Sequence, residues 1–191
     1  MKLICATGNP DKFAFGQAIL QKHGIELVQQ KIDIDEIQGE EPEYMLRQKA
    51  MSAFELLHAP VVVTDDWWDI PALGGFPGAY MKSINHWFTP EDFVALMSAK
   101  SDRRILLHAY LGYYDGKTFA FFESEDETGV IATEPRGAYG PPIMHVAVMD
   151  HDNGKTISEV YDAGKGHAPE RISSFSTAWH KLAKFLQEEN I

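Results

Sequence analysis

The segment from Thr7 to Lys12 is the first candidate site, because it combines a hydroxyl, a glycine, an amide and a lysine within six positions. A short apolar run delivers Gly8 and Asn9 to the start of a predicted helix, where backbone N–H groups can point at an anion. Lys12 lies one turn into this helix and can reach back to a phosphate. The Walker sequence GxxxxGK[ST] is absent. The residues alone leave two interpretations equally open: a phosphate-binding turn, or an ordinary capped turn with a surface lysine.

Two adjacent carboxylates, Asp65 and Asp66, follow a predicted buried strand over 60–64. Open α/β sheets place their ligands at the carboxyl ends of strands. Adjacent carboxylates repel each other, so a cation between or beside them would stabilise the pair. One carboxylate can then hold Mg²⁺ while the other takes a proton from water. A solvated strand end without function is the alternative, and it is the commoner fate of such a pair.

Lys49 and Glu36 are two further candidates for the same chemistry. Lys49 lies on the apolar face of a predicted helix over 43–58, four residues after Met45 and four before Ala53. It must either extend along that face to solvent, which is the favoured interpretation, or meet an anion. Glu36 in the acidic loop 33–42 is a candidate metal ligand, although a solvated run of charges explains this loop equally well.

The elements that position these residues follow the order of an α/β fold, opening with strand, tight turn, helix and strand. A helix is expected from Pro10, capped by Asn9, to the stop at His23-Gly24. Loop signals predict a shaped segment over 71–80, a hairpin turn at Asp115-Gly116 and a turn at Asn153-Gly154. The other predicted strands span 2–6, 25–29, 104–114, 118–125, 129–132 and 143–149, and the other predicted helices span 90–99 and 172–189.

Length and charge limit the function classes. The 191 residues favour one domain over 1–191, and two lobes sharing one sheet would also fit. The net charge of -11 argues against a basic surface for nucleic acid. An acidic protein can still bind a nucleotide when a few lysines and a divalent metal are focused in one cleft.

Cysteine and hydropathy patterns point to the cytoplasm. Cys5 is the only cysteine, and its apolar surroundings predict a buried, inert thiol. The N-terminal apolar run is too short for a signal peptide, and no segment approaches the ~20 apolar residues of a membrane span. We therefore expect a soluble cytoplasmic protein without a membrane partner.

Four sequence blocks occur in order along the first 140 residues, and together they are far more specific than any one of them. They are T-G-N-x-x-K at 7–12, E-x-Q-G-E at 36–40, the acidic pair with A-L-G-G-x-P-G-x-Y-x-K at 65–82, and G-x-I-x-x-x-P-R-G at 129–137. The chain thereby resembles the inosine triphosphate pyrophosphatase family, also called non-canonical purine NTP pyrophosphatases.

This resemblance implies an elongated mixed β-sheet with flanking helices, two lobes with the active-site cleft between them, and a homodimer. It also implies Mg²⁺-dependent cleavage of a nucleoside triphosphate to a monophosphate and pyrophosphate. The residues that would bind the triphosphate are Thr7, Gly8, Asn9, Lys12 and Lys49. By the same resemblance Glu36 and Asp66 would hold magnesium, and Asp66, with Asp65 beside it, would prepare the attacking water.

The chain departs from the family pattern where the family contacts the base. The F-G-W-D-P-x-F loop is replaced by residues 139–144, the S-H-R triplet by residues 173–175, and the E-K-N lysine is missing unless Lys165 substitutes for it. Trp67 and Trp68 replace the usual small pair after the aspartates. Together with Tyr139 and Phe175 they could stack a different base, or some of them could simply refill the core.

Three functions remain open from the sequence. The first is a Mg²⁺-dependent nucleotide pyrophosphatase with a shifted base specificity, which cleans or controls the nucleotide pool. The second is a catalytically silent nucleotide-binding regulatory protein on the same fold. The third and weakest is a hydrolase of another pyrophosphate ester. The preserved phosphate and metal residues favour the first, whereas the altered base-contacting residues favour the second.

Overall fold

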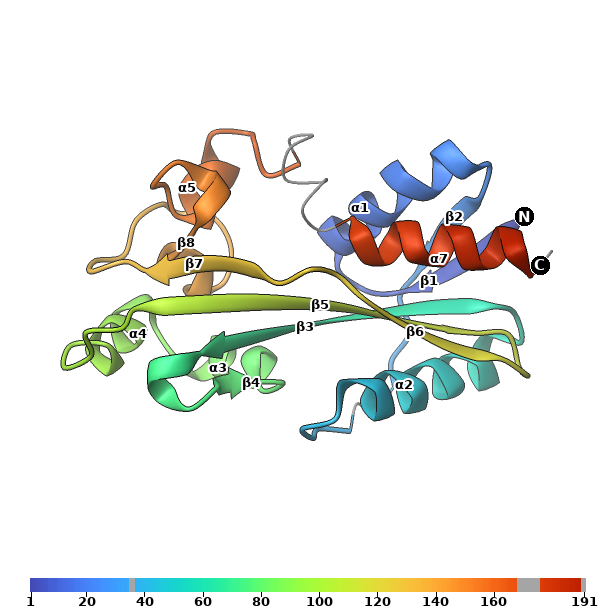
Figure 1. The fold of residues 1–191 in the computed structure, drawn as a ribbon, viewed down its shortest axis with the longest axis horizontal. Coiled ribbons are helices and arrows are strands. Elements are labelled where there is room, and N and C mark those ends of the chain that lie inside the picture. Colours follow the sequence, from blue (N-terminus) through green and yellow to red (C-terminus); the bar gives the residue numbers. More distant parts are fainter. Residues whose placement is uncertain (35–36, 168–175, 190–191) are drawn as a thin grey trace. The chain divides into compact units, whose positions relative to one another are not determined.

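The computed structural model describes residues 1–34, 37–167 and 176–189 (Figure 1). Contacts divide the chain into two compact units. The first comprises Met1–Asp66, Ala109–Glu125 and Ile172–Ile191, and the second comprises Trp67–His108 and Asp126–Arg171. Strands β3 (Val61–Ile70) and β5 (Arg104–Tyr114) contribute residues to both units. Within the described residues, no helix combines the length and the apolar character that crossing a membrane requires.

Eight strands form one mixed sheet, which confirms the predicted α/β class. The path of hydrogen-bonded neighbours is β2-β1-β3-β5-β7-β8, while β4 pairs with β3 and β6 pairs with β5. The pairs β1·β2 and β1·β3 are parallel, and the pairs of β4, β6, β7 and β8 with their neighbours are antiparallel. The strands not yet bounded are β1 (Lys2–Ala6), β2 (Glu26–Gln30), β4 (Phe76–Gly78), β6 (Phe119–Glu123), β7 (Glu127–Ile131) and β8 (Ala147–Met149).

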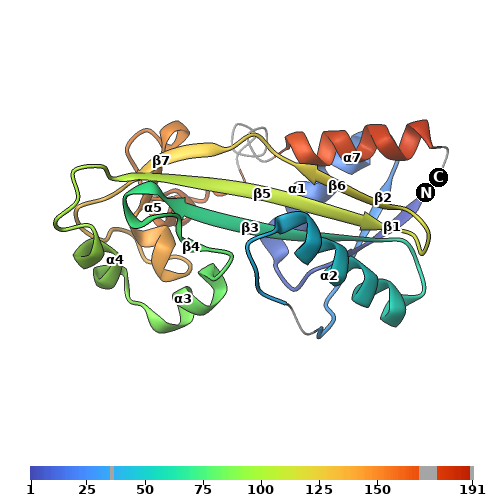
Figure 2. The ribbon, with the colours of Figure 1, turned by 60° about the horizontal axis from the view of Figure 1, so that its bottom comes forward.

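The first unit is a three-layer arrangement of helices on both faces of its strands. Helices α1 (Pro10–Leu20) and α7 (Thr177–Glu188) lie on one face, and α2 (Pro42–Leu57) lies on the other (Figures 1 and 2). Alternation along β3 separates the two cores: Val62 packs with α1 and α7, whereas Val61 and Val63 pack with α2. Each fully buried aliphatic side chain contributes about 1.5–3 kcal/mol, so both helical layers are firmly attached to the strands.

The second unit combines short helices with the remaining strand segments. Helices α3 (Met81–Trp87), α4 (Pro90–Leu96) and α5 (Ile157–Asp162) are short, and α4 and α5 begin with complete capping boxes. Arg103 donates to the main-chain oxygens of Met97, Ile131 and Ala132, at 3.2, 2.7 and 2.6 Å. This side chain thereby joins the end of α4 to the segment after β7.

Several predicted boundaries are confirmed. Strand β1 has the expected bounds, and α1 begins after the Asn9 cap and passes through a 3₁₀ turn (Gln21–His23) to Gly24 in the left-handed conformation. The hairpin β5–β6 encloses Asp115-Gly116, and Asn153 and Gly154 form the predicted turn with positive φ angles. The shaped loop after β3 contains Gly74 and Gly75 at φ angles of 68° and 91°, which a larger residue would not readily adopt.

Two strand predictions were wrong. The strand expected over 60–64 continues to Ile70, because Trp67, Trp68 and Ile70 favour extended structure and residues 68–70 pair with β4. The strand expected over 143–149 is divided into a 3₁₀ turn (Pro142–His145) and β8; the two prolines that directly precede the expected strand begin this turn and cannot donate to a strand ladder. Helices α3 and α5 were not predicted, since six or seven residues carry too little periodicity.

Candidate phosphate and metal site in the first unit

The candidate site lies where the strand order reverses within the first unit. From β1 the chain passes through α1 to β2 on one side, and α2 leads into β3 on the other side of β1. Since α1 and α2 cover opposite faces, a crevice outside the carboxyl end of β1 is expected at this switch point. The turn after β1 and residues 64–66 of β3, which extend past the last paired residue of β1, border this position.

The turn after β1 is closed by its own side chains. Thr7 Oγ1 accepts a hydrogen bond from Asn9 N at 3.1 Å, and Asn9 Oδ1 accepts from Asp11 N at 2.9 Å and from Lys12 N at 3.3 Å. In this structure the backbone N–H groups of Asn9, Asp11 and Lys12 are engaged by the turn's own side chains, as in the interpretation of an ordinary capped turn. An anion at the turn would have to rely on side chains or displace the cap.

Lys12 extends from the first turn of α1 to Asp66. Its Nζ lies 3.1 Å from Asp66 Oδ2, and the two side chains are 21% and 34% exposed. The lysine predicted for phosphate and the aspartate predicted for metal are thus brought together directly. At this exposure an ion pair contributes at most about 1 kcal/mol, so a charged ligand can replace either partner.

Lys49 approaches the same strand from α2. Its Nζ donates to the main-chain oxygen of Thr64 at 3.1 Å, in a partly buried position. The favoured expectation that this lysine would extend to solvent is therefore wrong, because its ammonium turns to the strand. The hydrogen bond places its positive charge next to the residue that precedes Asp65.

Asp65 and Asp66 lie inside β3, whereas the sequence predicted that they would follow the end of this strand. Side chains alternate along a strand, so Asp66 lies on the same face as Val62, which α1 covers. The contact of Asp66 with Lys12 of α1 agrees with this placement. Asp65 lies on the opposite face with Val61 and Val63, which α2 covers. Asp65 Oδ1 accepts a hydrogen bond from Asp66 N at 2.9 Å. The two carboxylates are therefore neighbours in sequence with distinct surroundings.

The two carboxyl groups also differ in their electrostatics. Burial raises the pKa of the Asp65 carboxyl above its ordinary value, against the opposing effect of Lys12 and Lys49. The negative charge of Asp66 raises this pKa further, and the hydrogen bond from Asp66 N lowers it. A carboxylate with a raised pKa is a better proton acceptor than an ordinary one.

The oxygen donors of this position fit magnesium. Mg²⁺ is usually bound through one or two carboxylates together with substrate phosphates, without a complete protein cage. Asp66 already holds a cation, the ammonium of Lys12, at its carboxylate. Glu36, the other predicted metal ligand, lies outside the described residues.

Two residues near the turn were not predicted. A Cβ placed on Gly8 would lie 3.4–3.5 Å from the side-chain carbons of Lys31, so this third lysine runs beside the turn. Gln29 Nε2 donates to the main-chain oxygen of Thr7 at 3.2 Å and links β2 to the same turn. No motif marks either residue, and only the parallel pairing of β1 with β2 would have indicated them.

The predicted base-contacting residues have separate outcomes. Tyr139, in the second unit, is 42% exposed and stacks on Tyr161 with ring centroids 4.6 Å apart and an interplanar angle of 7°. Trp68 is buried, which favours the core interpretation for this residue, and Trp67 is half-buried. Phe175 lies outside the described residues.

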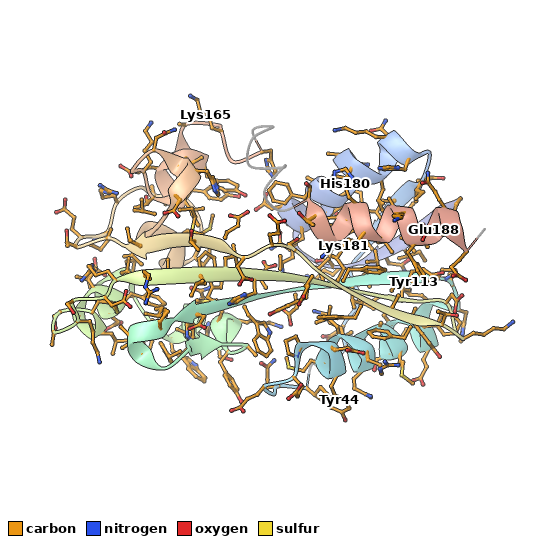
Figure 3. The ribbon with its side chains drawn as sticks, in the orientation of Figure 1. Tyr44, Tyr113, Lys165, His180, Lys181 and Glu188 are labelled. Atoms are coloured by element: carbon orange, nitrogen blue, oxygen red, sulfur yellow. The ribbon has the colours of Figure 1, made fainter. Side chains whose placement is uncertain are left out.

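The loop that carries Tyr139 is held by His145. Its Nδ1 and Nε2 lie 3.1 and 3.2 Å from the main-chain oxygens of Gly137 and Gly140. Lys165, the suggested substitute for the missing lysine, is exposed after α5 (Figure 3). Nothing in its contacts assigns it to a site.

Comparison with known proteins finds similar sequences over most of the chain. The model of the Ham1 family matches residues 3–185. A dITP/XTP pyrophosphatase of Methanosarcina mazei is 33% identical over 171 residues, which are 89% of this chain and 91% of that protein. An inosine triphosphate pyrophosphatase of Pyricularia oryzae is 33% identical over 187 residues, 96% of this chain and 93% of the relative.

Solved structures confirm the fold. A HAM1 protein from Coxiella burnetii superposes with a TM-score of 0.77 at 20% identity, covering 98% of this chain and 99% of the other. The Ham1 protein of Staphylococcus aureus gives a TM-score of 0.74 at 19% identity, covering 99% and 100%. The match to the Ham1 family model and the identity with the relatives confirm the resemblance inferred from the four sequence blocks.

Proposed function

The chain belongs to the Ham1 family, and on this premise we propose that it is a Mg²⁺-dependent nucleoside triphosphate pyrophosphatase with a shifted base specificity. The reaction hydrolyses the anhydride bond between the α- and β-phosphoryl groups. Water supplies the new oxygen, and a nucleoside monophosphate and pyrophosphate are released. The observation that carries the proposal is the pairing of Lys12 with Asp66 on β3. Asp65 is the next residue of this strand, and Lys49 of α2 donates to the main-chain oxygen of Thr64.

The names of the relatives support the substrate class. The Methanosarcina and Pyricularia proteins are named for the pyrophosphatase reaction on dITP, XTP or inosine triphosphate. These substrates share a triphosphate, and a protein that binds a triphosphate needs a cluster of positive charges and hydrogen-bond donors. Lys12 and Lys49 supply the charge in this role.

Thr7, Gly8 and Asn9 complete the triphosphate-binding group. In the unliganded turn, Thr7 and Asn9 use their oxygens as acceptors for backbone N–H groups. A phosphate oxygen can replace those acceptors, since the donors are already directed outward from the start of α1. Gly8 leaves room for this approach, because it presents no side chain at the centre of the turn.

Asp66 and Glu36 would hold Mg²⁺ on this proposal. When bound, the metal neutralises charge that develops on the phosphoryl oxygens. The chain's own residues orient the reactants: Lys12 and Lys49 fix the phosphates, and Asp66 with Asp65 aligns water and accepts its proton. The raised pKa of the Asp65 carboxyl suits it for the proton-accepting part of this task.

The shift in base specificity follows from lost donors and gained aromatic surface. Replacing a histidine and an arginine by residues 173–175 removes hydrogen bonds that a keto purine would otherwise receive, at a cost of several kcal/mol in discrimination. Tyr139 has one face against Tyr161 and remains 42% exposed. Tyr139 and Phe175 are our candidates for stacking the base.

The assembly and location are proposed from the family alone. We infer that the protein forms a homodimer in the cytoplasm. Its ligand is the nucleoside triphosphate, and we propose no nucleic acid or membrane partner. Sedimentation of the purified protein at several concentrations would test the dimer, because the average molar mass of a reversible dimer falls when dilution below its dissociation constant separates the subunits.

A panel of ribo- and deoxynucleoside triphosphates, scored for pyrophosphate release with and without Mg²⁺, tests the proposal. We expect release from at least one triphosphate with Mg²⁺ and none after chelation. Binding without release from any triphosphate would contradict the enzyme and favour a silent nucleotide-binding protein, which the altered residues 173–175 also favour. Release from a non-nucleotide pyrophosphate ester alone would identify a different hydrolase.

A further inference from the structure

We propose that Lys12 is a latch on the metal site: its ammonium occupies Asp66 until a triphosphate draws it away, so that metal and triphosphate bind cooperatively. The inference rests on the proposed function, because it takes Asp66 as the metal carboxylate. It goes further in assigning to one lysine two successive partners, first an aspartate and then a phosphate.

The contact itself has the properties of a latch. Lys12 Nζ and Asp66 Oδ2 are 3.1 Å apart, and both side chains retain contact with solvent at 21% and 34% exposure. The backbone of Lys12 is fixed independently, because its N–H donates to Asn9 Oδ1 at 3.3 Å at the start of α1. The lysine side chain can therefore exchange partners without a change in the helix.

The charges around the pair create mutual dependence between the two ligands. Lys12 pairs with Asp66, and the ammonium of Lys49 lies at the main-chain oxygen of Thr64 on the same strand. A divalent cation that approaches Asp66 alone meets the ammonium of Lys12, and a triphosphate that approaches Lys12 alone meets the carboxylate of Asp66. Each ligand relieves the repulsion that the other encounters, and this coupling must be reciprocal.

A purely structural ion pair is the alternative. In that case Lys12 would fasten α1 to β3, and its removal would lower stability without any gain in metal affinity. The two roles predict different effects of removing Lys12 on the affinity for Mg²⁺. Only a latch competes with the cation for Asp66, so only then does the affinity rise. Metal binding to the nucleotide-free protein therefore separates them.

The experiment is a calorimetric titration of Mg²⁺ into the nucleotide-free protein, comparing the wild type with Lys12→Met and Lys12→Arg. We expect Lys12→Met to bind Mg²⁺ about two- to tenfold more tightly than the wild type, the range set by a partly exposed pair and the lost repulsion. Lys12→Arg keeps the charge and should return the affinity to the wild-type value.

A matched control removes the same charge elsewhere in the first unit. Lys184 on α7 pairs with Glu188 at 3.6 Å, and the two side chains are 76% and 64% exposed (Figure 3 labels Glu188). Lys184→Met changes the net charge equally, and it should leave the affinity for Mg²⁺ within about twofold of the wild type, because the charges of so exposed a pair are screened by solvent and salt.

A second titration measures the coupling. The affinity for an α,β-imido nucleoside triphosphate should rise with Mg²⁺ in the wild type, and this rise should be smaller in Lys12→Met after correction for metal bound to the nucleotide in solution. Equal Mg²⁺ affinities of wild type and Lys12→Met would overturn the latch, while pyrophosphate release by the wild type would leave the proposed function standing. Absence of both Mg²⁺ binding and pyrophosphate release would overturn both.

Discussion

The ring of Trp179 occupies the space that a methyl group on Gly16 would need. A Cβ built on Gly16 would lie 2.5 Å from Cη2 and 2.6 Å from Cζ2 of this ring. Trp179 is buried in the core of the first unit, so the ring cannot swing into solvent. The close approach of α7 to α1 therefore depends on a helix residue without a side chain.

Gly16→Ala should destabilise the protein by about 1–3 kcal/mol, the usual cost of overpacking a core. The sign is informative, because glycine to alanine within a helix ordinarily stabilises by about 1 kcal/mol. Urea unfolding of the variant measures the effect. In a Trp179→Phe background, with a smaller ring, the same substitution should cost less. A stabilised Gly16→Ala would show that the helices can separate freely.

Tyr113→Phe should leave stability unchanged or raise it by about 1 kcal/mol at neutral pH, because the buried Tyr113 hydroxyl has no hydrogen-bond partner in the described residues. Figure 3 labels this residue, whose ring contacts Phe185 of α7 at a centroid distance of 5.7 Å. Thermal unfolding of the two proteins checks the prediction. A clear loss of stability would indicate a hydroxyl partner, such as an ordered water.

The pH dependence of stability should also change in Tyr113→Phe. Burial, followed by the charge of Asp115, raises the pKa of Tyr113 from 10.0 to about 12. The unfolded state therefore loses the phenolic proton at lower pH than the folded state, so stability falls as the pH rises from 10 to 12. The wild type should lose more stability than the variant across this range. Parallel curves would contradict the buried phenol as the cause.

Asp66→Asn should lower pyrophosphate release by at least about 10²-fold, the scale of a positioned acid–base group or metal ligand, while the fold is retained. Its carboxylate is 34% exposed and contributes little to the core. Steady-state kinetics with Mg²⁺ and a circular dichroism spectrum measure the two effects. Asp102→Asn, which breaks an exposed pair with Arg104 in the second unit, should leave activity unchanged. Full activity in Asp66→Asn would remove Asp66 from the site.

Lys12→Ala should weaken triphosphate binding by about 1–3 kcal/mol, the scale of a charged hydrogen bond. The loss should be present for every base, because Lys12 is assigned to the phosphates. Competition with a fluorescent nucleotide in the presence of Mg²⁺ measures the affinity, and Lys184→Ala provides the control for net charge. An unchanged affinity would show that the turn at 7–12 is an ordinary helix cap and does not bind phosphate.

The beginning of the fold was predictable because its signals are local. Asn9 and Pro10 indicate the start of α1, and Gly24 indicates the end of the 3₁₀ turn that follows it. These signals act through bonds within a few residues. The hairpin at Asp115-Gly116 was predictable for the same reason. These elements need no knowledge of distant contacts.

The extent of β3 and the character of its acidic pair were not predictable, because they depend on pairing. Trp68 pairs in register with Gly78 of β4, a partner ten residues away, and this pairing carries the strand through both aspartates. Sequence adjacency suggested that Asp65 and Asp66 share one cation. Strand alternation gives them different surroundings instead.

The residue types of the candidate site could be read from the sequence, but the contacts between these residues could not. The structure brings Lys12 to Asp66, which no spacing rule links, and turns Lys49 from solvent to Thr64 O. It also adds Lys31 beside Gly8 through the pairing of β1 with β2. Long side chains on helices reach over several positions, so sequence patterns locate their Cα atoms better than their charged ends.

The division of the chain into two units has a consequence for how substrate preference can change over generations. The candidates for phosphate and metal all fall within residues 7–66, whereas Tyr139 belongs to the other unit. Substitutions around Tyr139 can therefore alter which base is accepted without disturbing the charges that hydrolysis requires. On the proposed function, this part of the substrate preference would drift with mutations in the second unit, while selection keeps the charged residues of the first unit.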